Sequence, residues 1–364
     1  MSLPSVTLLL PNRNNGPVLD LTLRRLLDHT TYPSFELVVV DDGSSDDSKD
    51  ILRRWRDEAA FGAFTLIERE HGGAIEALNA GLSAASGELI VQLDGDATVE
   101  TPGWLERMVE FQRSDGAIGV VNSLVTFDSG RIQAAGVNVI CAEGLHDRGS
   151  WPMEPTGERT LNTRVKRVRP EEAGALVTAP AEVDAAIGVC MLYPRAVAEA
   201  IGGYDRGFSP VWFDDVDLSL SARRLGLKVF CLPEVHFVHR MSMRNVRGRT
   251  TAVGLMRSRA RRALGRVVSQ PVKDLIVGAA RLNRFGPEQL SRLEHHYRYW
   301  REKWGFDLLN PDMDEIQRRY GSTEVCWAYD SDRRRVGEDI LRRWTAHTRP
   351  DQPLFPSSAS SAGE

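Results

Sequence analysis

Short apolar runs alternate with segments of helical periodicity over the first 120 residues. The runs at residues 6–10, 35–40 and 89–93 are almost continuously apolar. Runs of this length are typical of strands buried on both faces of a parallel sheet. Between the first two, the leucines of residues 16–30 recur on one face of a helix. This alternation predicts an α/β domain with crossover connections.

The later part of the chain continues the alternation less regularly. We predict further helices over residues 45–60, 73–85, 194–201, 214–225 and 287–304, another that opens near Pro102, and strands over 185–193 and 228–232. Residues 123–184 are rich in loop-forming residues, and only isolated strands such as 136–140 are predicted there.

Charge and composition divide the chain into three parts. We expect an α/β domain over residues 1–243, a basic helical extension over 244–348 and a disordered tail over 349–364, which is rich in Pro, Ser and Ala. Residues 245–284 carry ten Lys or Arg and one acid. This basic segment is consistent with a solvated helix face, a surface for anionic lipid, or a contact with an anionic carrier or a second copy of the chain.

The overall composition excludes several classes of protein. The 364 residues carry 46 Lys and Arg against 50 Asp and Glu, a net charge of −4, which argues against a nucleic-acid partner. No apolar stretch is long enough to span a membrane, and the N-terminus lacks the pattern of a signal peptide. The four cysteines are far apart, so we expect a cytoplasmic protein without a zinc site or disulfides.

Acidic residues follow two of the predicted strands directly. Asp41 and Asp42 follow the second strand, and Asp94 and Asp96 follow the third. Ligands of open parallel sheets bind beyond the carboxyl ends of the strands, so both acidic pairs are expected at one crevice. Clustered carboxylates are costly unless a cation or a donor-rich ligand lies among them. Each pair alone is also a common turn or helix cap, but together they favour Mg²⁺ or Mn²⁺ with a diphosphate.

A third acidic cluster opens the helix predicted at residue 214. Asp214, Asp215 and Asp217 lie in its first turn. Their charge could simply complement the helix dipole. Alternatively, one carboxylate faces the crevice as a general base.

The motifs of residues 6–240 resemble those of the family 2 glycosyltransferases with the A-type (GT-A) fold. They are, in order, VTLLLPNRN, VVVDDGSSDDS, GAIEALNAG, LDGDA, IGGYD and FDDVDL. The resemblance implies a GT-A-like, mostly parallel sheet flanked by helices, here followed by the helical extension. The chain departs from many relatives at His71-Gly72, where Asn is common, and at Asp214, where Glu is usual.

The resemblance also implies roles for individual residues. Asp96 would be the main metal ligand, helped by Asp94 and His239, with Mn²⁺ or Mg²⁺ as the cofactor. Asp215 would be the catalytic base, with Asp214 beside it. Residues expected at the donor are Pro11, Asn12, Arg13, Asp42, Gly73, Asn79 and Asp94, with Asp42 at the nucleobase. Residues expected at the acceptor are Trp212 and Asp217.

The resulting hypothesis is a metal-dependent, inverting glycosyltransferase. It would move a sugar from a nucleotide-diphosphate donor to a hydroxyl of a glycan or lipid-linked acceptor in surface polysaccharide or glycoconjugate synthesis. The basic segment allows peripheral contact with the inner face of the membrane, and a homo-oligomer is possible. Two alternatives stay open: a non-catalytic scaffold that binds a nucleotide or partner, and a sugar nucleotidyltransferase.

Overall fold

The structure is a computed structural model that describes residues 3–128, 130, 132–136, 140–141, 144–145, 179–183, 185–241 and 287–304. The predicted helical stretch over 245–284 and the tail over 349–364 lie outside these residues, as does most of 137–178. The predicted domain boundaries at 243 and 348 therefore stay predictions.

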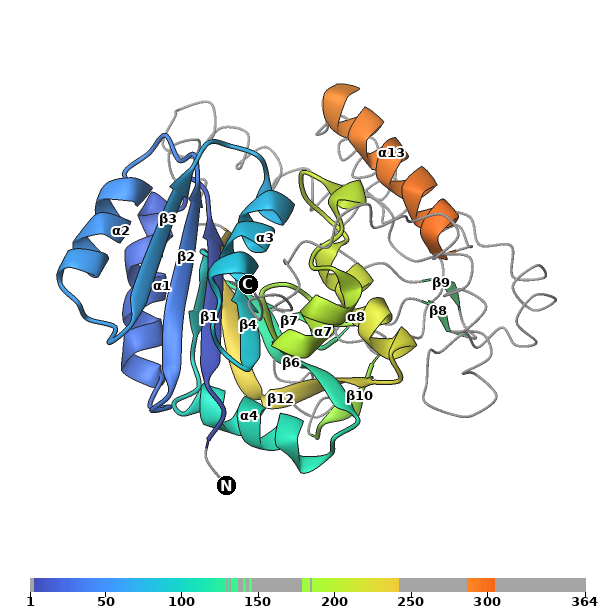
Figure 1. The fold of residues 1–364 in the computed structure, drawn as a ribbon, viewed down its shortest axis with the longest axis horizontal. Coiled ribbons are helices and arrows are strands. Elements are labelled where there is room, and N and C mark those ends of the chain that lie inside the picture. Colours follow the sequence, from blue (N-terminus) through green and yellow to red (C-terminus); the bar gives the residue numbers. More distant parts are fainter. Residues whose placement is uncertain are drawn as a thin grey trace, which may run out of the picture.

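A mixed sheet with helices on both faces forms the centre of the molecule (Figure 1). In the described residues it has ten strands, with the path β10-β12-β6-β11-β4-β1-β2-β3 and with β5 and β7 paired to β12 and β6. The strands are β1 (Val6–Asn12), β2 (Phe35–Asp42), β3 (Phe64–Arg69), β4 (Leu89–Leu93), β5 (Ala97–Val99), β6 (Ile118–Phe127), β7 (Ile132–Ala134), β10 (Ala181–Glu182), β11 (Cys190–Pro194) and β12 (Lys228–His239). A separate hairpin joins β8 (Ile140–Cys141) to β9 (Gly144–Leu145).

The helices fall close to their predicted positions. They are α1 (Gly16–His29), α2 (Ser48–Asp57), α3 (Ala74–Ala84), α4 (Trp104–Ser114), α7 (Arg195–Ile201), α8 (Asp214–Arg224) and α13 (Pro287–Trp304), with a 3-10 turn η1 (Arg206–Phe208). Right-handed crossovers place α1 and α2 on one face of the sheet and α3 on the other (Figure 1). None of the described helices is both long and apolar enough to cross a lipid bilayer.

The N-terminal half of the sheet is parallel. Strands β4, β1, β2 and β3 pair in parallel, and Asn12 at the end of β1 lies beside Asp41 at the end of β2. Leu8, Leu9 and Leu10 are completely buried, as a strand covered on both faces requires. The predicted α/β fold with a helix-flanked sheet is confirmed. The edge strand β3 was missed, because its side chains are only partly buried and its sequence lacks a continuous apolar run.

The other half of the sheet contains antiparallel strands. Strand β11 lies between β4 and β6 and is antiparallel to both. The predicted strand over 185–193 begins only at Cys190. The strand predicted over 228–232 continues to His239, through a register shift between Leu232 and His236. Pro233 interrupts the apolar pattern at this irregularity, which is why the sequence predicts an earlier end.

Helix α13 packs onto the α/β domain although it follows it by many residues in the chain. Its Trp300 and Trp304 are completely buried. The aromatic residues of α13 contact the segment between η1 and α8, including Phe208 and Phe213. Helix α13 therefore lies beside the acidic start of α8.

Candidate active site

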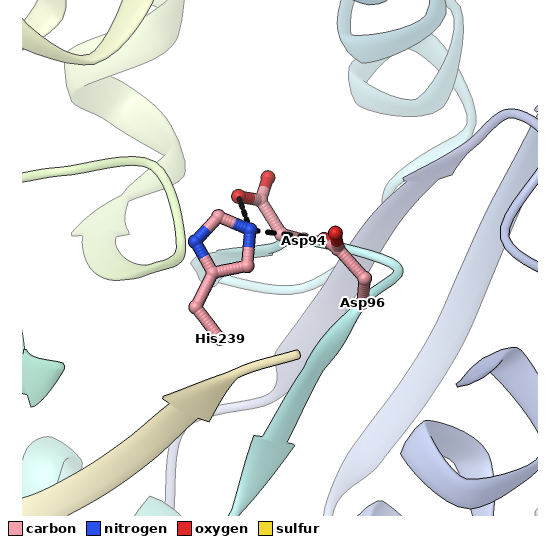
Figure 2. A group of neighbouring side chains, drawn as sticks. All are labelled: Asp94, Asp96 and His239. Carbon is pink, nitrogen blue, oxygen red and sulfur yellow. Dashed lines mark hydrogen bonds and ion pairs between the residues drawn. The ribbon is translucent and has the colours of Figure 1, made fainter. Parts of the chain in front are cut away.

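Two aspartates and a histidine meet at the carboxyl end of β4. Asp94 and Asp96 lie in the turn between β4 and β5, and His239 is the last residue of β12. The Nε2 atom of His239 lies 3.1 Å from Oδ1 of Asp96 and 3.8 Å from Oδ2 of Asp94. Figure 2 shows the imidazole directed at both carboxylates. The pairing of β12 with β5 places His239 opposite Ala97 and so brings it to this turn.

The glycine between the two aspartates lies close to the β1 loop. A Cβ atom on Gly95 would lie 2.7 Å from Nδ2 of Asn15 and 3.2 Å from Oδ1 of Asn12. The first distance is too short for a real contact, so a side chain here would displace the amide of Asn15. The tight approach holds the predicted donor residue Asn12 next to the two acidic residues.

The three side chains form a suitable ligand set for a divalent cation. One ligand atom from each of Asp94, Asp96 and His239 can lie within 4.8 Å of the other two. Carboxylate oxygens with one imidazole nitrogen suit Mn²⁺ and Mg²⁺, which usually keep further positions for phosphate oxygens. The predicted metal ligands are thus brought together.

Gln133 on β7 orients the histidine. Its Oε1 lies 3.0 Å from Nδ1 of His239 and can accept a hydrogen bond from it. In the neutral ring with the proton on Nδ1, the lone pair of Nε2 would be available to a cation held together with Asp94 and Asp96. We expect Gln133→Ala to weaken Mn²⁺ binding about 10–100-fold, the usual effect of losing a residue that orients a ligand.

Calorimetry with Mn²⁺ alone would measure this effect. Gln133→Glu keeps an acceptor for Nδ1 and is the matched comparison, with smaller expected loss. An Ala variant that binds Mn²⁺ as tightly as the parent would show that Gln133 does not orient the ligand.

Asp42 is held at the end of β2 by four donors. The backbone N–H groups of Gly72 and Gly73 donate to its carboxylate at 2.9 and 2.8 Å. Arg69 donates at 3.0 Å, and Nδ1 of His71 lies at 2.6 Å. The departure noted at His71-Gly72 therefore directly contacts the residue expected at the nucleobase.

The end of β1 supplies one unsatisfied polar group. Asn12 is buried and donates through Nδ2 to Asp41 at 2.9 Å, while its Oδ1 has no hydrogen-bond partner among the described residues. Pro11 is partly buried and Arg13 is exposed. A buried acceptor without a partner is costly, so a donor group of a ligand would stabilise this position.

Gly73 and Asn79 join α3 to the loop before α8. Gly73 has φ +103°, and a Cβ there would lie 2.3 Å from Pro210, so only glycine fits. The side-chain amide of Asn79 donates to the carbonyl oxygen of Tyr204 and accepts from its N–H group, each at 2.9 Å. Asn79 is buried in this contact, and the donor contact expected for it stays a prediction.

The carboxylate of Asp215 is buried and oriented by backbone amides. Gly188 donates to Oδ2 and Val216 to Oδ1, each at 2.8 Å. The carbonyl oxygen of Val189, next to Gly188, accepts from the N–H of Asp94 at 3.2 Å. The backbone at 188–189 therefore links the acidic start of α8 to the turn that carries Asp94 and Asp96.

Asp214 is less buried and lies beside a polar chain inside the sheet. Nε2 of Gln92 lies 3.4 Å from its Oδ2. Tyr204 donates its hydroxyl to Oε1 of Gln92 at 2.6 Å, and the hydroxyl of Tyr193 lies 2.7 Å from that of Tyr204. Burial raises the pKa of both tyrosines, so they stay protonated donors. The sequence does not indicate this row of hydrogen-bonded side chains, because Gln92 lies inside an apolar strand.

The two residues before Asp214 have an unusual backbone. Trp212 and Phe213 have φ values of +90° and +63°, a region that bulky residues rarely occupy. Trp212 is partly exposed beside the acidic cluster, where an acceptor wall was expected. Strained backbone of this kind is common at functional sites.

Asp217, which is expected at the acceptor, contacts helix α13. Its carboxylate is buried and accepts from Lys303 at 2.8 Å and from the indole N–H of Trp304 at 3.0 Å. Both partners belong to α13. Asp217 therefore fastens α13 to α8, and no sequence pattern linked it to a residue so far along the chain.

Comparison with known proteins agrees with this geometry. The model of the family described as "Glycosyl transferase family 2" matches residues 7–202, more than half of the chain. An O-antigen biosynthesis protein of Myxococcus xanthus is 27% identical over 241 residues, which are 66% of this chain and 17% of that protein. An uncharacterized protein of Sinorhizobium fredii is 29% identical over 243 residues, 66% of this chain and 25% of the other. The chain thus spans a quarter or less of the length of these two relatives.

A solved structure shows the same fold. The crystal structure of GalNAc-T7 with UDP, GalNAc and Mn²⁺ has a TM-score of 0.50 and 18% sequence identity, and the match covers 66% of this chain and 44% of that one.

Proposed function

Because the chain belongs to glycosyl transferase family 2, we propose that it transfers a sugar from a nucleotide-diphosphate donor to an acceptor hydroxyl with inversion at the anomeric carbon. The observation that carries this proposal is the linkage of two groups in one site. The Asp94–Asp96–His239 group suits a cation with a diphosphate, and the backbone at 188–189 connects it to Asp215.

The donor would bind across the ends of β1, β2 and β4. The unsatisfied Oδ1 of Asn12 and the partly exposed pair of Arg69 and His71 around Asp42 offer polar contacts to a nucleoside. Asp94, Asp96 and His239 would hold Mn²⁺ or Mg²⁺, which when bound supplies positive charge for the diphosphate. Pro11 and Arg13 border the same loop, and Gly73 presents its backbone there.

The acceptor side would be formed by the start of α8. Asp215 takes the proton of the acceptor hydroxyl while the hydroxyl oxygen bonds to the anomeric carbon. The bond from that carbon to the diphosphate oxygen breaks in the same step. Attack from the side opposite the diphosphate inverts the centre. Asp214 lies beside the base, and Trp212 is our candidate for a wall against the acceptor sugar.

The names of two relatives support a proposal for the class of acceptor. The printed name of the M. xanthus relative concerns O-antigen biosynthesis. Another relative, from Pseudomonas syringae, is named for transfer of a modified arabinose to undecaprenyl phosphate and is 33% identical over 125 residues. We therefore propose a glycan or lipid-linked acceptor in surface polysaccharide synthesis. Family membership and the complete acidic set favour this enzyme over a nucleotidyltransferase or an inactive scaffold.

Thermal unfolding with a panel of sugar nucleotides tests the donor half of the proposal. Each nucleotide is measured with Mn²⁺, with Mg²⁺ and with a chelator. We expect one nucleotide class to raise the Tm only with metal, since a ligand at 100 times its Kd stabilises the native state by about 2.7 kcal/mol. If no nucleotide raises the Tm under any condition, the scaffold alternative is favoured.

A further inference from the structure

One face of α13 is buried against the segment that carries the proposed base. His296, Trp300 and Trp304 are completely buried, and Lys303 is 2% exposed. A lysine is rarely buried to this extent unless its charge is paired. The burial of Lys303 therefore indicates that α13 is attached to this segment through a paired charge.

Lys303 contacts two carboxylates, one at the start of η1 and one in the first turn of α8. Its Nζ lies 2.5 Å from Oδ2 of Asp205, next to η1, and 2.7 Å from Oδ1 of Asp217, in the first turn of α8. Tyr299 adds a hydrogen bond of 2.9 Å to Asp205. Asp217 lies two residues after Asp215 on the same helical turn. Removing the ammonium would leave two largely buried carboxylates without the cation that both of them contact.

His296 supports the strained turn between these two carboxylates. Its Nε2 lies 3.0 Å from the carbonyl oxygen of Ser209 and donates to it. Its ring centroid lies 6.0 Å from that of Trp212 and 6.3 Å from that of Phe213, the two residues with positive φ. Such a backbone persists only where neighbouring structure holds it.

We propose that α13 is a positioning element of the acceptor side, in which Lys303 and His296 hold residues 209–217 in the conformation that presents Asp215 to the acceptor. This inference rests on the base role proposed for Asp215. The metal and nucleotide side is held by β1, β2, β4 and β12, so we expect it to persist when α13 is loosened. Lys303 and His296 are thus positioning residues and not catalytic ones.

Hydrogen exchange of the full chain tests the inference directly. In Lys303→Met, amide exchange in residues 209–217 should become roughly tenfold faster or more, because the buried pair is broken. Binding of UDP and GDP with Mn²⁺, measured by calorimetry, should stay within about twofold of the parent. The rate of donor hydrolysis, in which the sugar is transferred to water, should fall roughly tenfold or more because the base is misplaced. The donor in this assay is the sugar nucleotide that raises the Tm in thermal unfolding.

Three further variants make the test specific. Lys303→Arg keeps the charge and should recover part of both the protection and the turnover, while Glu302→Gln changes an exposed neighbour and should alter neither. Tyr299→Phe removes one hydroxyl and should give a smaller increase of exchange in the same segment, which serves if Lys303→Met does not fold.

The outcomes separate the inference from the proposed function. Unchanged exchange in 209–217 in folded Lys303→Met, or in Tyr299→Phe if Lys303→Met does not fold, would overturn the inference, and so would faster exchange with normal turnover. If the parent transfers no sugar at all, the proposed function fails, whereas the exchange data still decide whether α13 holds the segment.

Discussion

Asp215→Asn is expected to lower kcat for sugar transfer by roughly 10²–10⁴-fold, the usual contribution of a general base. The amide has nearly the same shape and can still accept a hydrogen bond from Gly188 or Val216, but it cannot take the acceptor proton. Nucleotide affinity should change little, because the donor side is held by other elements. The variant is assayed by release of nucleoside diphosphate, with affinity measured by calorimetry.

Two comparisons define this result. Asp214→Asn should cost less turnover, because Asp214 is more exposed than Asp215 and its contact with Nε2 of Gln92 is long, at 3.4 Å. Asp50→Asn changes a surface carboxylate that is 85% exposed and should behave as the parent. Near-normal turnover in Asp215→Asn together with a large loss in Asp214→Asn would assign the base to Asp214.

Asp96→Asn should abolish most metal-dependent nucleotide binding, with a loss of affinity of at least about 100-fold, since even residues that only orient a ligand contribute 10–100-fold. The side chain is 2% exposed and lies 3.1 Å from the imidazole of His239. Asparagine preserves the volume but removes a charge that would face the cation. Calorimetry with UDP and GDP in Mn²⁺ measures the loss.

The same titrations in chelator provide the control. Without metal, parent and Asp96→Asn should bind each nucleotide equally weakly, because the variant leaves Asn12 and Asp42 unchanged. His239→Ala should reproduce the direction of the effect. An Asp96→Asn variant with full metal-dependent affinity would show that the cation, if one binds, is held elsewhere.

The sequence predicts the strands that carry the expected donor residues well, because these strands depend on local pattern. Apolar runs define β1, β2 and β4, and parallel pairing then brings Asp42, Asp94 and Asp96 to one edge of the sheet. His239 was expected only from the family resemblance. Its contact with Asp96 requires β12 to continue past Leu232, which the apolar pattern does not predict.

The acceptor side depends on contacts that no local pattern encodes. Asp217 and Lys303 are 86 residues apart, and Asn79 and Tyr204 are 125 apart. In the sequence, Asp217 resembles its acidic neighbours and Asn79 resembles a donor residue. Only the packing of α13 and of the η1 region shows which distant residues these two side chains contact. Gln92 and Gln133 were missed for the same reason, since each lies in a strand and acts on a residue far along the chain.

The position of His239 also has a consequence for how the chain acquires its site during synthesis. Asp96 and His239 are 143 residues apart, and they meet only after β12 has paired with both β5 and β6. Long-range pairings of this kind form late in folding, because a large loop must first close. An emerging chain would thus complete its parallel half first and acquire the third ligand last. Cation affinity would then report on the completion of folding as well as on readiness for reaction.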